Sequence, residues 1–357
     1  MKAAILTSSG EIRYAEMAEP EMKPGTVKVR VRACGICGSD VPRVLYNGAH
    51  FYPLVLGHEF AGDVVEVGTG VTNVKVGDRV SCAPLVPCRT CADCQRGSFS
   101  LCPNYSFIGS REQGGMAEYV VMPEANAVRY GGDVAYETAA MFEPATVALH
   151  GILLNGGVSG MDVAVVGCGT IGIFAIQWAK LLGARSIVAF DIAKDRLDFA
   201  LRMGADAAFD TREADFDRCA RAVTLGGAGF DAVFDVSGCE ATIHGAFRLA
   251  ANRARVCIIG TPVRDVSFSK PMWELMNRKE FLLTGSWMSY SAPFPGREWK
   301  MVSDYATSGR FAFDPQLIFR KYPLSRTAEA FDLFRDPSQV HGKVMLMCGE
   351  ETEGGCG

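Results

Sequence analysis

A glycine-rich turn between an apolar strand and a helix constrains the fold of this chain more than any other feature. Residues 167–172 read GCGTIG and directly follow the short apolar segment 162–166. Glycines at this spacing permit a tight turn and let the pyrophosphate of a dinucleotide approach the backbone at the positive end of the helix. The predicted contacts to a dinucleotide come from Gly167, Gly169, Thr170, Ile171 and Gly172.

An acidic residue ends the next predicted strand, 186–191, where the motif requires one. Asp191 lies 19 residues after Gly172, close to the usual spacing of about 20. A carboxylate here accepts hydrogen bonds from the ribose hydroxyls and repels a 2′-phosphate, so the sequence favours NAD over NADP. Arg196 either lies over the adenine or belongs to a solvated helix start.

Strands and helices alternate regularly from residue 162 to residue 287. Apolar strand-like segments are predicted at 162–167, 186–191, 230–238, 255–260 and 281–287. Segments of helical character separate them, at 171–183, 194–204, 213–224, 240–251 and 271–279. This alternation is typical of βαβ units, so residues 151–287 are predicted to form an α/β, Rossmann-type doubly wound parallel sheet.

The sequence on either side of this region is organised differently. Short alternating segments at 27–33, 62–68 and 77–82 predict the strands of a β-rich, barrel-like domain. The regular alternation ends near residue 288. We therefore expect residues 1–150 and 288–357 to form one domain into which the nucleotide domain is inserted.

Four cysteines lie close together in the segment PCRTCADCQRGSFSLC. The spacing of Cys88, Cys91, Cys94 and Cys102 lets four thiolates surround one tetrahedral zinc ion. An iron–sulfur cluster is the competing metal site, and four unrelated thiols are the alternative without a metal. A zinc ion with four protein ligands has no open position, so we expect a structural site that stiffens a lobe at about residues 82–105.

A second set of metal-type ligands is spread over the first part of the chain. Cys37 lies in CGICGSD, His58 and Glu59 lie in LGHEFAG, and Glu143 is the carboxylate of the apolar run MFEPATVALHG. Each residue alone has an ordinary alternative, such as a small buried thiol or a core histidine. Three or four such ligands with an exchangeable position would form a catalytic zinc site. Cys34 and Cys37 also form a CxxC pair, but the βαβ context of a redox motif is missing.

Length and composition define the class of protein. The chain has 357 residues, 48% hydrophobic and 21% charged, with a formal net charge of −4. We therefore expect two globular domains and no nucleic-acid or anionic-membrane surface. No signal peptide is recognisable, and the apolar stretches are shorter than the about 20 residues of a membrane helix. A cytoplasmic protein is expected, in which the 13 cysteines serve as metal ligands or thiols rather than disulfides.

Taken together, these motifs resemble the zinc-dependent medium-chain dehydrogenases over essentially the whole chain. Glu143 stands where alcohol dehydrogenases place a cysteine. In this respect the chain resembles the sorbitol-dehydrogenase-like branch of the family. Three further stretches resemble members of this branch that oxidise a phosphorylated sugar alcohol: CGSDVPRVLYNGAHFYPLVLGHEFAG, FIGSREQGGMAEYV and GSWMSYSAPFPGREW. The resemblance implies a Rossmann domain that binds NAD, a GroES-like catalytic domain, and two zinc ions per chain, one catalytic and one structural.

The resemblance also implies roles for individual residues. Cys37, His58 and Glu143 would ligate the catalytic zinc, and Glu59 would exchange with water or substrate. Cys88, Cys91, Cys94 and Cys102 would hold the structural zinc.

A proton relay is implied as well. Ser39 would carry its first hydroxyl. Pro42 stands where many relatives have a relay histidine, so the route beyond Ser39 is open; His50 is a candidate, with a surface turn as the alternative.

The substrate implied by the resemblance is galactitol 1-phosphate, oxidised at C5 to tagatose 6-phosphate while zinc stabilises the alkoxide and hydride passes to NAD. A phosphate group needs cationic donors. The candidates are Arg43, Arg111, Arg297 and Lys343, each with the alternative of a surface charge or an internal partner. Trp287 and Tyr290 either line the substrate pocket or belong to an aromatic core.

Three alternative functions remain open from the sequence. The chain could oxidise an unphosphorylated polyol such as sorbitol, xylitol or arabinitol, or it could be a threonine-type dehydrogenase, because these enzymes share the zinc ligands and the nucleotide fold. An inactive NAD-binding sensor should have lost zinc ligands, and none is missing here.

The resemblance further implies a homodimer or homotetramer.

Overall fold

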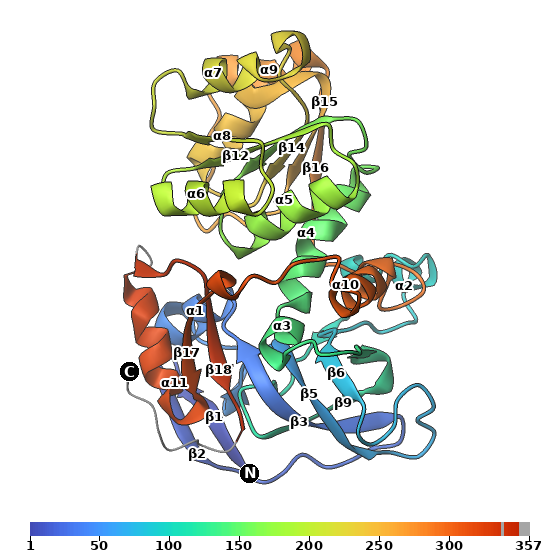
Figure 1. Cartoon of the computed structure of the whole chain (residues 1–357). Helices are drawn as coiled ribbons and strands as arrows, with labels where there is room; N and C mark the ends of the chain where they lie inside the picture. Colours follow the sequence, from blue (N-terminus) through green and yellow to red (C-terminus); the bar gives the residue numbers. More distant parts are fainter. Residues whose placement is uncertain (337–338, 350–357) are drawn as a thin grey trace. The chain divides into compact units, whose positions relative to one another are not determined.

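The computed structural model describes residues 1–336 and 339–349. The chain divides into two units, which are considered separately (Figure 1). The first unit comprises Met1–Glu143 and the chain from Tyr290 onward, and the second comprises Pro144–Ser289.

The second unit is built on a six-stranded parallel sheet. Its strands are β11 (Asp162–Val166), β12 (Ser186–Asp191), β13 (Ala207–Asp210), β14 (Phe230–Asp235), β15 (Ala250–Ile258) and β16 (Leu282–Gly285). Their order in the sheet is β13-β12-β11-β14-β15-β16. The direction of winding reverses between β11 and β14, and open α/β sheets bind their ligands at such a reversal.

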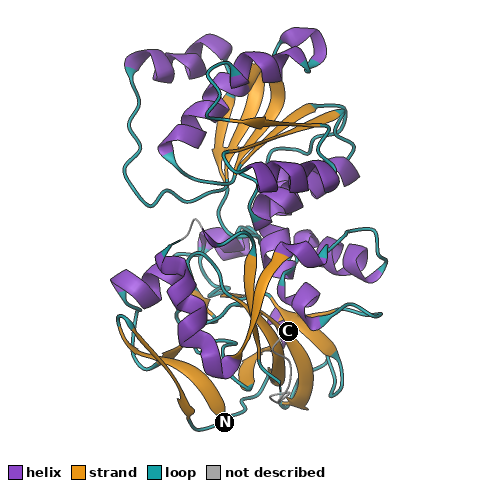
Figure 2. Cartoon of the chain, turned by 60° about the vertical axis from the view of Figure 1, so that its left-hand side comes forward, coloured by secondary structure: helices purple, strands orange, loops and turns teal. Residues whose placement is uncertain are grey.

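Helices cover both faces of this sheet (Figure 2). They are α4 (Phe142–Leu154), which begins at the end of the first unit, α5 (Thr170–Leu181), α6 (Lys194–Arg202), α7 (Phe216–Ala222), α8 (Glu240–Leu249) and α9 (Lys270–Lys279). Residues of α7, α8 and α9 share one apolar cluster with Val166, Val188 and Phe190 of the sheet. Because strand side chains alternate between faces, the remaining apolar residues of β11 and β12 face the opposite side.

Two details of this unit differ from the sequence prediction. Strand β13, Ala207–Asp210, was not predicted, because it is short and two of its four residues are alanines, which are poor strand formers. Strand β15 begins at Ala250 rather than at residue 255. Its first part is separated from the rest by a register shift against β14, and such an irregularity interrupts the apolar alternation that marks a strand.

The first unit contains three sheets. The largest runs β10-β6-β5-β3-β18-β17, with β9 also paired to β3, and the others are β2-β1-β4 and β7-β8. The strands are β1 (Lys2–Ser8), β2 (Glu11–Glu16), β3 (Thr26–Gly35), β4 (Leu54–Val55), β5 (Glu59–Val67), β6 (Arg79–Cys82), β7 (Leu85–Val86), β8 (Ser106–Phe107), β9 (Tyr119–Pro123), β10 (Ala127–Arg129), β17 (Ile318–Pro323) and β18 (Lys343–Met347). The helices are α1 (Asp40–Pro42), α2 (Ala92–Gln95), α3 (Tyr136–Ala140), α10 (Arg297–Thr307) and α11 (Thr327–Asp332).

Strand β3 is the centre of the large sheet. Its residues Val27, Val29 and Val31 are fully buried in the core of the unit, and the intervening positions carry lysine and arginine. Near its carboxyl end β3 pairs antiparallel with both β5 and β18. The C-terminal part of the chain therefore returns to the first unit and lies beside the segment that leads to Cys37.

Within residues 1–336 and 339–349, the helices are too short or too polar to cross a membrane.

Candidate active site

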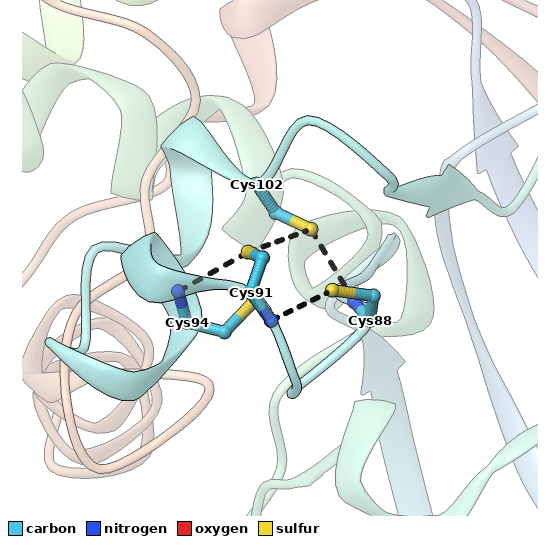
Figure 3. A group of neighbouring side chains, drawn as sticks. All are labelled: Cys88, Cys91, Cys94 and Cys102. Atoms are coloured by element: carbon cyan, nitrogen blue, oxygen red, sulfur yellow. Dashed lines mark hydrogen bonds between the residues drawn. The ribbon is translucent and has the colours of Figure 1, made fainter.

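The four predicted zinc-binding cysteines converge in a small lobe of the first unit (Figure 3). The sulfur atoms of Cys88, Cys91, Cys94 and Cys102 all lie within 4.8 Å of one another. Helix α2 begins after Cys91, whose sulfur accepts the backbone N–H of Cys94 at 3.5 Å. The lobe is therefore shaped by N–H···S hydrogen bonds of the kind that support thiolates.

The spacing of the sulfurs tests whether zinc fits here. The sulfurs of Cys91 and Cys102 are 3.8 Å apart. Tetrahedral coordination at a Zn–S distance of about 2.3 Å gives an S···S distance of about 3.8 Å. Hydrogen bonds from Thr90 lower the pKa of the Cys88 thiol, which favours the thiolate that a metal requires. The four cysteines therefore fit a closed zinc site.

A second cluster of metal-type ligands lies where neighbouring strands of the large sheet end. Cys37 follows β3 by two residues, and Glu59 is the first residue of β5. Gly35 pairs with Glu59 in the sheet, and a Cβ on Gly35 would collide with the Glu59 carboxylate. Glycine at this position therefore lets the carboxylate pack against the backbone beside Cys37.

The ligand atoms of this cluster are close together. Those of Cys37, His58 and Glu59 lie within 4.8 Å of one another, and His58 and Glu59 are buried. The exposed Ser39 directs its hydroxyl to the Cys37 sulfur at 3.4 Å. The Phe107 and His58 rings pack in a T-shaped arrangement with 5.4 Å between their centroids. A soft sulfur, an imidazole and a carboxylate close together are a donor set suited to zinc.

Asp40 belongs to this site, although the sequence analysis did not select it. It is fully buried, accepts the backbone N–H of Cys37 at 3.2 Å, and lies 3.6 Å from Nδ1 of His58. Burial lowers the pKa of His58, but Asp40 and Cys37 outweigh burial and raise it to about 10. A carboxylate behind a histidine is the usual support of a metal-binding imidazole. The signal that could have revealed it is an aspartate three residues after Cys37.

Lys343 occupies a different place from the one predicted. Its ammonium group is buried and lies 2.6 and 2.8 Å from the two oxygens of Glu59. It also donates to the carbonyl of Ile36 at 3.3 Å. Of the two alternatives for Lys343, the structure therefore favours an internal partner over a phosphate ligand, because its charge compensates the buried Glu59 carboxylate.

Glu143, the predicted third ligand, is not one of the three residues whose ligand atoms gather. It is the second residue of α4. Burial raises the pKa of the Glu143 carboxyl above its usual value, and His58 opposes this shift while Glu59 adds to it. The carboxylate therefore lies within the electrostatic range of the cluster, and Glu59 occupies the position nearer to Cys37 and His58.

The glycine turn of the second unit has the geometry that a dinucleotide requires. Gly167 has a φ of +102°, in the left-handed region, and a Cβ on Gly172 would collide with the carbonyl of Gly167. Helix α5 begins after Gly169, and no side chain among the described residues caps it. The N–H groups of its first turn, at Thr170 and Ile171, are therefore free to bind an anion.

Asp191 fixes the turn from the next strand. Its carboxylate accepts the backbone N–H groups of Cys168, Ile192 and Ala193 at 2.7, 2.8 and 3.0 Å. A carboxylate offers about four lone-pair positions, so these donors leave room for a ribose hydroxyl. Arg196 is half-buried, two residues into α6.

Three of the predicted substrate residues, Arg43, His50 and Arg111, act on one another electrostatically in the first unit. Arg43 donates to the carbonyl of Ser39, and Arg111 stacks on Tyr105 with its guanidinium 4.5 Å from the ring centre. Burial lowers the pKa of the exposed His50, and the charges of Arg111 and Arg43 lower it further. Both arginines therefore lie close enough to His50 to act on its charge.

The remaining substrate candidates do not join this group. Tyr290 is buried, its hydroxyl accepts the N–H of Leu85 at 2.9 Å, and its ring stacks on Phe294. Its prediction as a pocket residue is replaced by a packing role. Arg297 is an exposed residue at the start of α10, and Trp287 is 49% exposed on the second unit.

Comparison with known proteins identifies the family. The family model described as alcohol dehydrogenase GroES-like domain matches residues 23–131, and that described as zinc-binding dehydrogenase matches residues 170–304. Galactitol 1-phosphate 5-dehydrogenase of Escherichia coli (strain K12) is 37% identical over 348 residues, which cover 97% of this chain and 100% of that protein. The chain belongs to the zinc-dependent medium-chain dehydrogenases.

Other similar members of this dehydrogenase family act on different substrates. L-threonine 3-dehydrogenase of Symbiobacterium thermophilum is 37% identical over 340 residues, which cover 93% of each chain. The crystal structure of galactitol-1-phosphate dehydrogenase from Escherichia coli has a TM-score of 0.92 at 37% identity and covers 97% of this chain and 100% of that chain. The likeness confirms the predicted fold, a GroES-like unit with a Rossmann-type α/β unit. In this zinc-dependent family, the four cysteines of Figure 3 are a structural zinc site.

Proposed function

We propose that this dehydrogenase oxidises a sugar-alcohol phosphate to a ketose phosphate with NAD, with galactitol 1-phosphate and tagatose 6-phosphate as the specific pair. The observation that carries the proposal is that two arginines flank the Cys37–His58–Glu59 cluster: Arg43 donates to the carbonyl of Ser39, whose hydroxyl contacts the Cys37 sulfur, and Arg111 bonds through its backbone N–H to Phe107, whose ring packs on His58. Two arginines beside the metal ligands suit a phosphorylated substrate. The 37% identity to galactitol 1-phosphate 5-dehydrogenase over 97% of the chain supports the specific pair.

The metal ligands proposed for catalysis are Cys37, His58 and Glu143, with Glu59 as the exchangeable ligand. A zinc ion bound there would polarise the substrate hydroxyl and lower its pKa. The Asp40 carboxylate lies next to Nδ1 of His58 and orients the imidazole ring. Lys343 holds the Glu59 carboxylate at 2.6 Å, so that Glu59 keeps a compensated charge when it is not a ligand.

Ser39 is proposed as the group that takes the proton of the reacting hydroxyl. Its own hydroxyl is exposed and lies 3.4 Å from the Cys37 sulfur. A hydroxyl at this position can accept a proton from the substrate and pass its own to solvent. Pro42 has no titratable group, so the described chain offers His50 as the next candidate in the relay.

NAD is proposed as the hydride acceptor, bound by Gly167, Gly169, Thr170, Ile171, Gly172 and Asp191, with Arg196 beside the adenine. The Asp191 carboxylate supports NAD over NADP, because it would lie close to a 2′-phosphate and repel it. It is held by three backbone N–H groups, so it cannot turn away from the cofactor without breaking these bonds.

A threonine dehydrogenase is the second candidate function, and the 37% identity to L-threonine 3-dehydrogenase favours it. That substrate carries no phosphate, and an amino acid does not require two arginines beside the zinc ligands. We further propose a cytoplasmic location, because none of the twelve cysteines among the described residues is in a disulfide.

The experiment that tests the proposed reaction follows the hydrogen on C5. Galactitol 1-phosphate with deuterium at C5 is incubated with the enzyme and NAD, and the products are analysed by mass spectrometry. The expected result is deuterated NADH together with unlabelled tagatose 6-phosphate, and a much slower reaction with NADP. Deuterium retained in the sugar product would exclude oxidation at C5.

A further inference from the structure

We propose that Arg43, His50 and Arg111 together form the site that binds the phosphate group of the substrate and selects phosphorylated over free polyols. This inference rests on the proposed function, and it adds the residues that recognise the phosphate. All three residues belong to the first unit, which also holds the Cys37–His58–Glu59 cluster.

Arg43 is tied to the cluster through Ser39. Its guanidinium donates to the carbonyl of Ser39, the residue whose hydroxyl touches the Cys37 sulfur. The arginine side chain is 26% exposed, and its nearest carboxylate is Asp40 at 3.8 Å. Arg43 is therefore a positioned, partly buried cation one helical turn from Ser39, whose hydroxyl contacts the metal ligand Cys37.

Arg111 reaches the cluster from a different segment. Its backbone N–H donates to the carbonyl of Phe107 at 2.8 Å, and the Phe107 ring packs against His58. Its guanidinium lies over the Tyr105 ring, which holds a planar cation without neutralising it. Arg111 is therefore also one turn away from a residue that touches a metal ligand.

His50 links the two arginines. It lies in the segment 46–53 that follows Arg43, and it is exposed. The charges of Arg111 and Arg43 both act to lower its pKa. The two arginines, which come from distant parts of the sequence, are therefore both within electrostatic range of the same imidazole.

The hydrogen-bonding capacity of these three side chains is largely unused. Within residues 1–336 and 339–349, the Arg43 side chain forms one hydrogen bond, to Ser39, and the side chains of Arg111 and His50 form none. A guanidinium carries five N–H donors. Many other arginines of the chain are paired with carboxylates, among them Arg212 and Arg326. The two arginines thus retain unused N–H donors.

A phosphate dianion is well suited to bind the unused guanidinium donors of Arg43 and Arg111. It accepts two parallel hydrogen bonds from a guanidinium and is attracted by the neighbouring cations. In a polyol phosphate oxidised at C5, the phosphate is attached to C1, so it must lie a short carbon chain away from the metal ligands. Arg43 and Arg111, each one turn beyond Ser39 and Phe107 respectively, are placed to bind this phosphate group.

The test compares galactitol 1-phosphate with galactitol in the zinc-loaded enzyme and its variants. For Arg43→Gln and Arg111→Gln, the ratio of kcat/KM for the phosphate to kcat/KM for the free polyol is expected to fall by about ten- to hundredfold. Arg43→Lys, which keeps the charge but not the fork, should lose less. Arg310→Gln is the matched control, because Arg310 is exposed and stacks on Tyr305 at 4.4 Å in the same way; its ratio should stay within about twofold of wild type.

A second readout is independent of turnover. Inorganic phosphate is titrated into the wild-type protein and into the Arg43→Gln and Arg111→Gln variants, and the ring resonances of His50 are followed by NMR, with His50→Asn used for assignment. Phosphate should raise the pKa of His50 in the wild type and much less in the variants.

The possible outcomes separate the two proposals. If wild type prefers the phosphate while both glutamine variants keep its ratio, the assignment of the phosphate site is wrong and the proposed function stands. If phosphate leaves the His50 resonances unchanged in wild type, the assignment also fails. If wild type itself shows no preference for the phosphate, the proposed function and this inference fail together.

Discussion

Replacing Cys37 with serine is expected to lower kcat/KM for galactitol 1-phosphate by at least about 1000-fold, or about 4 kcal/mol of transition-state stabilisation. The thiolate is the softest ligand of the cluster, and its sulfur is also the contact of the Ser39 hydroxyl at 3.4 Å. A serine oxygen is a poor replacement for a thiolate in a zinc site. Initial rates of NAD reduction measure the effect.

The same Cys37→Ser variant should bind NAD nearly as well as wild type, because the residues predicted to bind NAD all lie in the second unit. Cofactor binding is followed by the fluorescence of NADH. Cys219→Ser, at an exposed cysteine outside both metal clusters, is the matched control and should keep full activity. Turnover of Cys37→Ser within about tenfold of wild type would contradict the assignment of the catalytic ligand.

Replacing Cys94 with serine is expected to remove the structural zinc and to destabilise the first unit. Cys94 is 5% exposed, and the lobe around it consists of a four-residue helix and two-residue strands. Such a segment has little apolar core of its own, and binding of a structural zinc is worth about 10–16 kcal/mol in small domains. We expect the free energy of unfolding to fall by at least about 5 kcal/mol. The expected loss is smaller than the full binding energy because three of the four cysteine ligands remain.

Metal content and denaturant unfolding measure this second effect together. Wild type and Cys219→Ser should contain two zinc ions per chain, Cys94→Ser one, and its unfolding transition should move to lower denaturant. Cys94→Ser with two zinc ions and unchanged unfolding would show that the four cysteines do not hold a structural metal.

The parts of the site that depend on local spacing could be predicted from the sequence. The four cysteines lie within 15 residues of one another, so their separation alone constrains them to one ion. The glycine turn likewise lies within one strand–turn–helix segment, and strand β12 was predicted with its observed bounds, Ser186–Asp191.

The contacts between distant segments could not be predicted in this way. Lys343 and Glu59 are 284 residues apart in sequence, and only the antiparallel pairing of β18 with β3 brings them together. A buried lysine and an exposed one look alike in a sequence, so Lys343 was assigned to the phosphate. The same limit applies to Tyr290, whose hydroxyl bonds to Leu85 across 205 residues, and to Asp40, whose role depends on the position of His58.

Selection of a phosphorylated polyol over unphosphorylated substrates distinguishes the proposed function from its alternatives. The most direct measurement compares kcat/KM for galactitol 1-phosphate, free galactitol, sorbitol and L-threonine, with NAD and the same zinc-loaded preparation. The predicted result is a preference for galactitol 1-phosphate of at least about a hundredfold, or about 2.7 kcal/mol. Equal or faster oxidation of a free polyol, or of L-threonine, would contradict the proposed function and leave a dehydrogenase of an unphosphorylated substrate.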